Sequence, residues 1–386
     1  MVEMAPITFP VYILFFLIFC MLFFFAVVNP SRSSKQPFPY SFVSTPYTPD
    51  EVADEDKKTI TWIIHAYPPT HNAGSEWMAH AINRYLIEKR GYKVNVIVPT
   101  FPTREFEGVH MIVFDQTTKI EHAIRHSALL LSHHTYTMHT VLTGAQAKRP
   151  VLLFMHDHNQ EEVVEQCRSR IPRENLYLVN NSRWLQKLYS NLDLQSFVIY
   201  PPVYWREYRM TLSDKNRYVT LINLNKNKGG DVLIQIAKRM PDVQFLGVEG
   251  SYNLQIKDKT IKNIRYMKNT PKIQEVYAMT KILLIPSQEE SWGRVAVEAM
   301  SSSIPVIANP TPGLREACGD AGLFADRENI SEWIRIIREL MNNPTYYKKI
   351  GDASFTRAKQ LDPETQLSSF ALWSGEIKWQ QKRMNF

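Results

Sequence analysis

Several signatures that define common protein classes are missing from this sequence. Its 386 residues include only 3 cysteines, Cys20, Cys167 and Cys318, an odd number at wide spacing. This pattern favours neither a disulfide framework nor a cysteine-based zinc site, and it fits a reducing compartment. We find no basic stripe with interleaved aromatic residues and no known nucleic-acid-binding motif, so no nucleic-acid partner is expected. The net charge of +7 suits anionic ligands such as nucleotides, although scattered surface lysines would give the same value.

Motifs of several enzyme classes are also absent. The chain has no HExxH, no Ser-His-Asp arrangement, no paired-aspartate motif and no GxGxxG with an acidic residue downstream, which disfavours a dinucleotide dehydrogenase. Two local groups of histidines stand out instead, although their spacing matches no common metal-binding motif. We therefore predict no metal and no cofactor. These histidines are His133, His134, His139, His156 and His158.

An uncharged apolar run near the N-terminus, residues 7–28, would rise roughly 33 Å as a helix, enough to cross a hydrocarbon core. A cleaved signal peptide is the alternative, but the run lacks a basic flank before it and has bulky phenylalanines near its end. Arg32 and Lys35 follow the run while only Glu3 precedes it. The expectation is a single-pass membrane anchor with a cytosolic catalytic domain. Residues 29–58, rich in Pro and Ser, read as a tether.

The remainder of the chain alternates short β-like runs with helix-length segments, which predicts parallel sheets covered by helices. Two prolines, Pro201 and Pro202, and the polar stretch at 203–217 that follows them interrupt this rhythm; we take 203–217 as a linker. The chain is also too long for one ordinary core. The predicted fold class is α/β, with two doubly wound, Rossmann-like domains and a cleft between them. Their bounds are 59–202 and 218–345, followed by C-terminal helices at 346–386.

In open parallel sheets, ligands bind beyond the carboxyl ends of the strands, so the turns after each predicted strand were inspected. The first holds Gly74 in NAGSE before a helix, where backbone could approach a phosphate, although such a sequence is often only a turn. The second holds Lys228 in NKGGD. This lysine could neutralise a diphosphate, or it could be a solvated turn residue. The spacing is not that of a Walker loop.

The third turn is the most informative, and its sequence is PSQEESWGRVAVEAM. Glu290 lies on the loop, where a carboxylate can accept hydrogen bonds from sugar hydroxyls. Glu298 lies on the following helix among apolar neighbours, where a charge is costly unless it is paired. Gly293 would let phosphate oxygens reach the start of that helix. The remaining candidate binding residues of this turn are Ser291, Trp292 and Arg294.

At these three motifs, and at PVIANPTPGLRE, the sequence resembles glycosyltransferase family 4, a large family of retaining enzymes with the GT-B fold. The resemblance covers roughly residues 60–345. It implies that Glu290 contacts the donor sugar, Glu298 the ribose and Lys228 the diphosphate. It also implies that the loop with Gly74 approaches donor and acceptor, and that His156 lies near the reacting sugar.

One position departs from the family pattern. The family pairs its lysine with an arginine five residues earlier, and this chain has Asn223 there. One diphosphate cation is therefore missing, unless Arg294 substitutes for it.

The predicted function is metal-independent, retaining transfer of a hexose from a UDP- or GDP-sugar to an acceptor. That acceptor would be a glycan, a glycolipid or another lipid-linked sugar, or a glycoprotein. Catalysis would depend on cations and amides placed where the leaving diphosphate gains charge. An inverting enzyme would need a general base, for which His156 is the candidate. The alternatives are a nucleotide-sugar epimerase and a non-catalytic sugar- or nucleotide-binding membrane protein.

Overall fold

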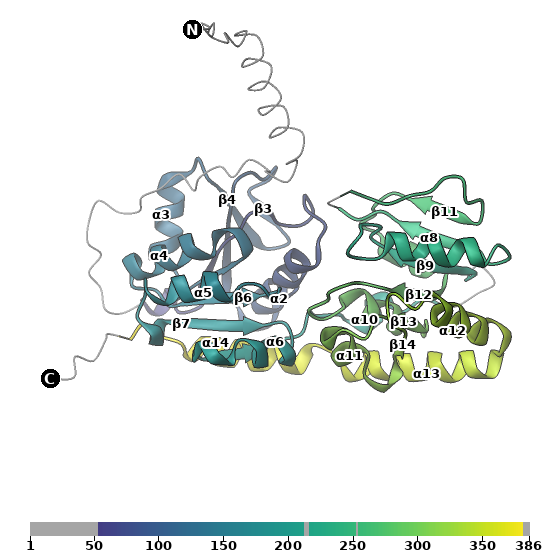
Figure 1. Ribbon diagram of the computed structural model, residues 1–386. Coiled ribbons are helices and arrows are strands. Elements are labelled where there is room, and N and C mark those ends of the chain that lie inside the picture. The colour runs from purple at the N-terminus through teal and green to yellow at the C-terminus, as the bar shows by residue number, and fades with distance from the viewer. Residues whose placement is uncertain (1–52, 212–215, 252–253, 381–386) are drawn as a thin grey trace, which may run out of the picture. The chain divides into compact units, whose positions relative to one another are not determined.

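The computed structural model describes residues 53–211, 216–251 and 254–380, and these residues form two parallel sheets with flanking helices (Figure 1). The first sheet has eight strands in the order β3-β4-β2-β1-β5-β6-β7-β8, and only β3 runs antiparallel to its neighbour. Its strands are nearly all apolar, as expected for a sheet covered on both faces. Their bounds are β1 Thr59–Ile63, β2 Lys93–Val98, β3 Glu105–Phe106, β4 Val109–Val113, β5 Leu129–His133, β6 Val151–Met155, β7 Leu176–Asn180 and β8 Ser196–Val198.

The helices of this N-terminal lobe connect consecutive strands. The longest of them, α2, carries its buried residues on one face and ends at Gly91, whose φ of +69° suits glycine. The helices are α2 Gly74–Arg90, α3 Thr117–Arg125, α4 Thr137–Ala147, α5 Glu161–Arg168 and α6 Arg183–Leu188. A short helix, α7 at Trp205–Tyr208, follows the first sheet.

The second sheet has six parallel strands in the order β11-β10-β9-β12-β13-β14. This is the order of a dinucleotide-type doubly wound sheet, and its direction reverses between β9 and β12. The strands are β9 Tyr218–Ile222, β10 Phe245–Val248, β11 Ile264–Met267, β12 Thr280–Ile285, β13 Val306–Ala308 and β14 Leu323–Phe324. The helices of this C-terminal lobe are α8 Gly230–Arg239, α9 Ile273–Tyr277, α10 Arg294–Ser301, α11 Pro312–Cys318, α12 Ile330–Asn342 and α13 Pro344–Gln360.

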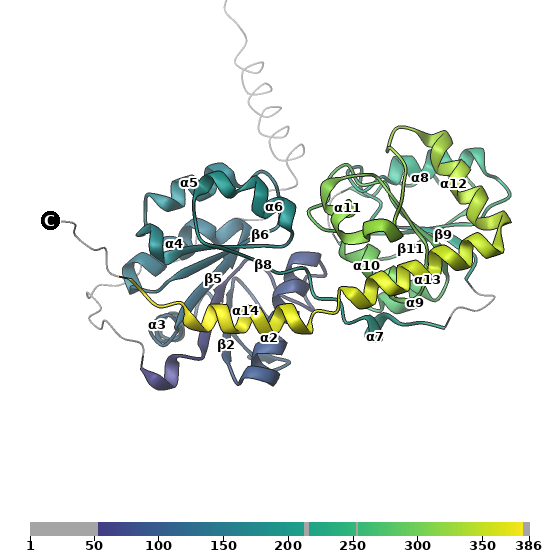
Figure 2. The same ribbon diagram turned by 90° about the horizontal axis from the view of Figure 1, so that it is seen from below.

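The last described helix, α14 at Glu364–Glu376, packs on the N-terminal lobe rather than on the sheet that precedes it in sequence (Figure 2). Leu367 and Phe370 are fully buried in the core around Trp62 and Phe154. The side chain of Gln366 also accepts a hydrogen bond from the backbone N–H of Tyr200, at 3.1 Å. The C-terminus therefore completes the core of the lobe that the chain forms first.

The predicted membrane location requires a correction. Among the described residues, no helix is long and apolar enough to cross a membrane. The longest of them, α2 and α13, have 17 residues each and carry charged side chains, whereas a span needs about 20 mostly apolar residues. The expected anchor at residues 7–28 and most of the expected tether lie outside the described residues. The prediction of a single-pass membrane protein is therefore withdrawn.

Candidate functional site

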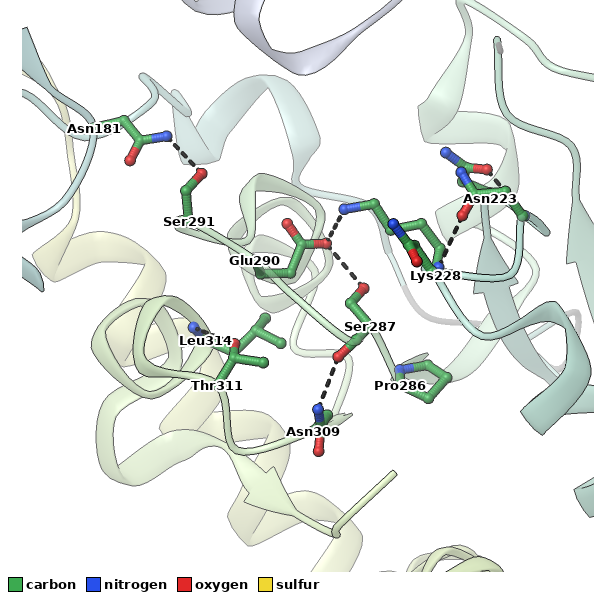
Figure 3. A network of polar contacts seen from close by, with 12 residues as sticks. Asn181, Asn223, Lys228, Pro286, Ser287, Glu290, Ser291, Asn309, Thr311 and Leu314 are labelled. Carbon is green, nitrogen blue, oxygen red and sulfur yellow. Dashed lines mark hydrogen bonds and ion pairs between the residues drawn. The ribbon is translucent and has the colours of Figure 1, made fainter. Parts of the chain in front are cut away.

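Two loops meet at the carboxyl edge of the second sheet, where its strand order reverses. The loop after β9 carries Lys228, and the loop after β12 carries Glu290. Lys228 Nζ donates to Glu290 Oε1 at 2.5 Å, and Ser287 Oγ donates to the same oxygen at 3.0 Å (Figure 3). Both charged side chains are partly exposed, at 26% and 15%. The two residues expected to contact diphosphate and sugar thus neutralise each other in this structure.

Close packing of the two loops explains why glycine follows the lysine. Gly229 has a φ of +95°, and a Cβ there would lie 2.4 Å from Pro286 Cγ. The backbone N–H of Gln288 donates to the carbonyl of Asn227 at 2.7 Å, which joins the loops directly. Any side chain at position 229 would force the two loops apart.

A buried arginine that no sequence motif marks ties these loops together. Arg327 is 7% exposed; it donates to the carbonyls of Pro286 and Lys226 and pairs with Asp231 at 2.8 Å. Asn309 Nδ2 donates to the carbonyl of Ser287 at 2.8 Å (Figure 3). These contacts hold the backbone that presents Lys228 and Glu290.

Glu298, the second glutamate of the motif, lies on α10 and takes part in a buried network of hydrogen bonds. Arg294 Nε donates to Glu298 Oε1 at 2.7 Å, and Tyr277 Oη donates to Glu298 Oε2 at 2.7 Å. Arg294 Nη2 also donates to Tyr208 Oη at 2.9 Å. Although burial acts against the charged guanidinium, the Glu298 carboxylate raises the pKa of Arg294 above its usual range. Two of the guanidinium nitrogens are thus committed to protein partners.

The position of Asn223 suits asparagine better than the arginine that the resemblance would lead one to expect. Asn223 has a φ of +71°, in the left-handed region that asparagine tolerates better than most residues. Its side chain packs on Gly250, where a Cβ would lie 2.3 Å from Asn223 Cγ. Its Oδ1 accepts from the N–H of Asn225 at 3.2 Å. An arginine at this position would meet both backbone strain and close packing.

The remaining residues of the SWGR turn face protein. Ser291 Oγ accepts from Asn181 Nδ2 at 2.8 Å, a contact with the loop after β7 (Figure 3). Trp292 is 2% exposed and stacks on Tyr200 with ring centroids 3.9 Å apart. Gly293 has a φ of +111° directly before α10, and a Cβ there would lie 2.6 Å from a Leu314 methyl carbon. Donor contacts of Trp292 and Gly293 would therefore have to come from backbone atoms.

In the N-terminal lobe, the predicted residues lie at the carboxyl edge of the first sheet. Gly74 is the exposed first residue of α2, with no atom within 4 Å of the Cβ position. His156 follows β6 and is 8% exposed. Burial, together with neighbouring His134, lowers the pKa of His156 to about 3, so its imidazole is neutral at physiological pH.

The structure brings only part of the histidine groups together. His133, His134 and His156 each offer a ligand atom within 4.8 Å of the others. A second group, His65, Glu76 and His133, meets the same criterion, and of its members only His133 was a predicted candidate. His139 instead packs against Tyr136 on α4. His65 and Glu76 were not predicted as site residues because a loop separates them in the sequence. The sequence feature that could have identified them is that His65 follows a strand and Glu76 lies in the first turn of the next helix.

Comparisons with known proteins show which family the second lobe matches. Residues 208–357 match the family model described as Glycosyl transferases group 1. An uncharacterized glycosyltransferase of Methanocaldococcus jannaschii is 27% identical over 298 residues, covering 71% of this chain and 82% of that protein. A D-inositol 3-phosphate glycosyltransferase of Corynebacterium aurimucosum is 29% identical over 157 residues, which span only 36% of this chain and 37% of the relative.

Solved structures support the fold. The Anabaena HepE structure with UDP and glucose superposes with a TM-score of 0.67 at 18% identity, over 82% of this chain and 99% of HepE. A glycosyltransferase of Rickettsia africae gives a TM-score of 0.68 at 15% identity, over 83% and 98% of the two chains. The expected α/β architecture with two Rossmann-like sheets is thereby confirmed. Residues 208–357 thus match the glycosyl transferases group 1 family, and the described residues have the GT-B fold.

Proposed function

We propose that the chain transfers a hexose, with retention of anomeric configuration, from a UDP- or GDP-sugar to a glycan, glycolipid or glycoprotein acceptor. The observation that carries this proposal is the Lys228–Glu290 pair at the strand-order reversal of the second sheet. Ligands of doubly wound sheets bind at that place. A solved structure of HepE with UDP-glucose, which shares the fold, supports a UDP-sugar as the first donor to test.

Donor binding would separate this ion pair. A diphosphate is a doubly charged competitor for Lys228, and the start of α10 adds free amides and a positive dipole end. Once Lys228 turns to the diphosphate, Glu290 is left to accept hydrogen bonds from sugar hydroxyls. The diphosphate of the donor would thus replace Glu290 as the partner of Lys228, and the freed Glu290 carboxylate would bind the sugar of the same donor.

Glu298 is proposed to hold the ribose. Its two oxygens accept one hydrogen bond each from Arg294 and Tyr277, and a carboxylate has about four lone-pair sites in all. The remaining sites can accept ribose hydroxyls, while the two protein donors fix the orientation of the carboxylate. In this arrangement Arg294 is a positioning residue and does not replace the cation missing at Asn223.

Retention is favoured by the state of His156. With a pKa lowered to about 3 by burial, this imidazole is a weak base at neutral pH and is poorly suited to activate an acceptor for inversion. In same-face transfer, the bond from the anomeric carbon to the diphosphate oxygen breaks as the acceptor oxygen bonds to that carbon. The acceptor proton passes to the departing diphosphate. Lys228 and the amides stabilise the developing charge, so this step needs no metal on the diphosphate.

The test replaces Glu290 by Gln and uses Glu289→Gln as the matched control, because Glu289 is the adjacent carboxylate and is 63% exposed. Thermal shift with UDP-, GDP- and ADP-sugars selects the donor, calorimetry gives its Kd, and proton NMR gives the configuration of the product. Glu290→Gln should lower kcat more than it weakens donor binding, since sugar contacts matter most in the transition state. Unchanged turnover in Glu290→Gln would remove this residue from the site. Donor turnover without any acceptor would indicate an epimerase instead.

A further inference from the structure

The first sheet has its own reversal of strand order, between β1 and β5, and three metal-ligand side chains gather there. Parallel pairing aligns Ile63 of β1 with Ser132 of β5, which places His65, just past the end of β1, near His133, the last residue of β5. Glu76 reaches the same place from the first turn of α2. Each of the three offers one ligand atom, and these atoms all lie within 4.8 Å of one another.

The spacing of two of these atoms fits a shared metal better than a hydrogen bond. His65 Nε2 and Glu76 Oε1 are 3.3 Å apart, longer than the roughly 2.7–2.9 Å of a charge-assisted hydrogen bond. Zinc bonds of about 2.0–2.1 Å in a tetrahedral site put neighbouring ligand atoms about 3.3–3.4 Å apart. The pair is therefore already at the separation that one zinc ion would impose.

Glu76 is a buried carboxylate without a strong cationic partner. It is 1% exposed, and within the part of the chain that the structure describes its ion-pair partner is His65. A buried carboxylate that has no lysine or arginine as an ion-pair partner among the described residues lacks the charge compensation that burial demands. A divalent cation would supply that charge.

One ring nitrogen points to the same missing ligand. Within the described ranges, His133 Nε2 is buried and has no hydrogen-bond partner. His133 is 1% exposed, so water cannot satisfy this nitrogen and leaving it unpaired is unfavourable.

We propose that His65, Glu76 and His133 form a binding site for a divalent transition metal, and that zinc is its occupant. Two imidazoles and one carboxylate are a ligand set that zinc uses, with a fourth position left to water or substrate. His65 is 33% exposed, so the site is open on that side. Ser75 Oγ donates to the second oxygen of Glu76 at 2.8 Å, the kind of outer contact that orients a ligand carboxylate. The site does not depend on the proposed sugar transfer.

This set is preferred to the neighbouring group of His133, His134 and His156 because only Glu76 brings a negative charge to the metal. The sequence predicted no metal because the three ligands come from separate elements and match no short motif.

The test measures metal content and affinity in the purified full-length chain, prepared without a histidine tag. Mass spectrometry gives the zinc stoichiometry, and competition with a chromogenic chelator gives the Kd. The variants are His65→Gln and Glu76→Gln. The matched control is His122→Gln, which removes an exposed histidine from α3. Cobalt substitution would report a tetrahedral site by its visible absorption.

Wild type and His122→Gln should bind one zinc per chain, and both site variants should bind it at least about tenfold more weakly. Zinc should raise the Tm of wild type and should not raise that of His65→Gln, whose Tm without metal shows that it folds. Absence of zinc binding by wild type, or equal affinity in the site variants, would overturn the proposal. Binding that survives in these variants and is lost in His134→Gln would overturn it too, in favour of the other histidine group.

Discussion

Replacing Arg294 by Ala separates two roles for this residue, a diphosphate cation or a partner that holds Glu298. In the structure, Arg294 is 17% exposed and Glu298 7% exposed, and 2.7 Å separates Nε from Oε1. Removing one member of a buried ion pair costs about 3–5 kcal/mol, because the other charge remains buried without compensation. Tyr277 would still donate to Glu298, so the lower half of that range is expected.

Urea unfolding followed by tryptophan fluorescence measures this loss, and Trp292 in the same core reports it directly. Arg335→Ala is the matched control. Arg335 pairs with Glu339 at the same i,i+4 spacing, but it is 60% exposed, so its removal should leave the free energy of unfolding close to that of wild type. Solvent screens the exposed pair and not the buried one.

The double variant Arg294→Met with Glu298→Leu sharpens the test. Removing both charges together should cost less than the sum of the two single replacements, because no charge is left buried alone. A loss below about 1 kcal/mol in Arg294→Ala, combined with a tenfold or greater loss of UDP affinity, would refute the positioning role. Arg294 would then be the substitute for the arginine absent at Asn223.

Three further outcomes are expected. Lys228→Ala should weaken binding of the nucleoside diphosphate by about 1.5–3 kcal/mol, and the loss should be smaller at high salt. The control Lys226→Ala, which removes an exposed lysine, should not weaken it. Equal affinities of Lys228→Ala and wild type by calorimetry would show that Lys228 is a solvated turn residue. Phe370→Ala should lower the free energy of unfolding of the N-terminal lobe by about 3–5 kcal/mol, because it removes a large side chain from the core. Hydrogen exchange of the β6 amides measures this loss, and exchange as slow as in wild type would contradict the packing of α14. The free energy of unfolding should fall as pH drops below about 6.5, because the unfolded chain then binds protons that the buried rings of His133 and His156 do not bind in the folded state. With its pKa lowered to about 3, His156 alone should destabilise the fold by about 2 kcal/mol at pH 5. An equal urea midpoint at pH 7 and pH 5 would contradict this.

The strands and the donor-side motifs could be predicted from sequence because their signals are local. Apolar runs such as residues 151–155 are followed directly by turn residues, and a parallel sheet then fixes the edge at which those turns lie. The pairing of Lys228 with Glu290 could not be predicted, because it depends on how closely two loops approach at Gly229. Likewise, the left-handed backbone of Asn223 follows from the packing around it.

Contacts between distant elements account for most of what sequence reasoning missed. The apolar face of α14 predicts a helix that packs on something, but nothing in it specifies the N-terminal lobe. His65 and Glu76 become neighbours of His133 only when β1 pairs with β5. The membrane prediction rested on the apolar run at residues 7–28, which lies outside the described residues, and no described helix is long and apolar enough to cross a bilayer.

The return of α14 to the first sheet imposes an order on biosynthesis. The strands of the N-terminal lobe are complete once β8 has been made, yet Leu367 and Phe370 of its core emerge about 170 residues later. At roughly 5–20 residues per second, that delay is on the order of 10–30 s. During this time the nascent lobe exposes the apolar surface that α14 will cover, which is a natural binding surface for a ribosome-associated chaperone. Premature termination anywhere in the C-terminal lobe would therefore leave both lobes defective.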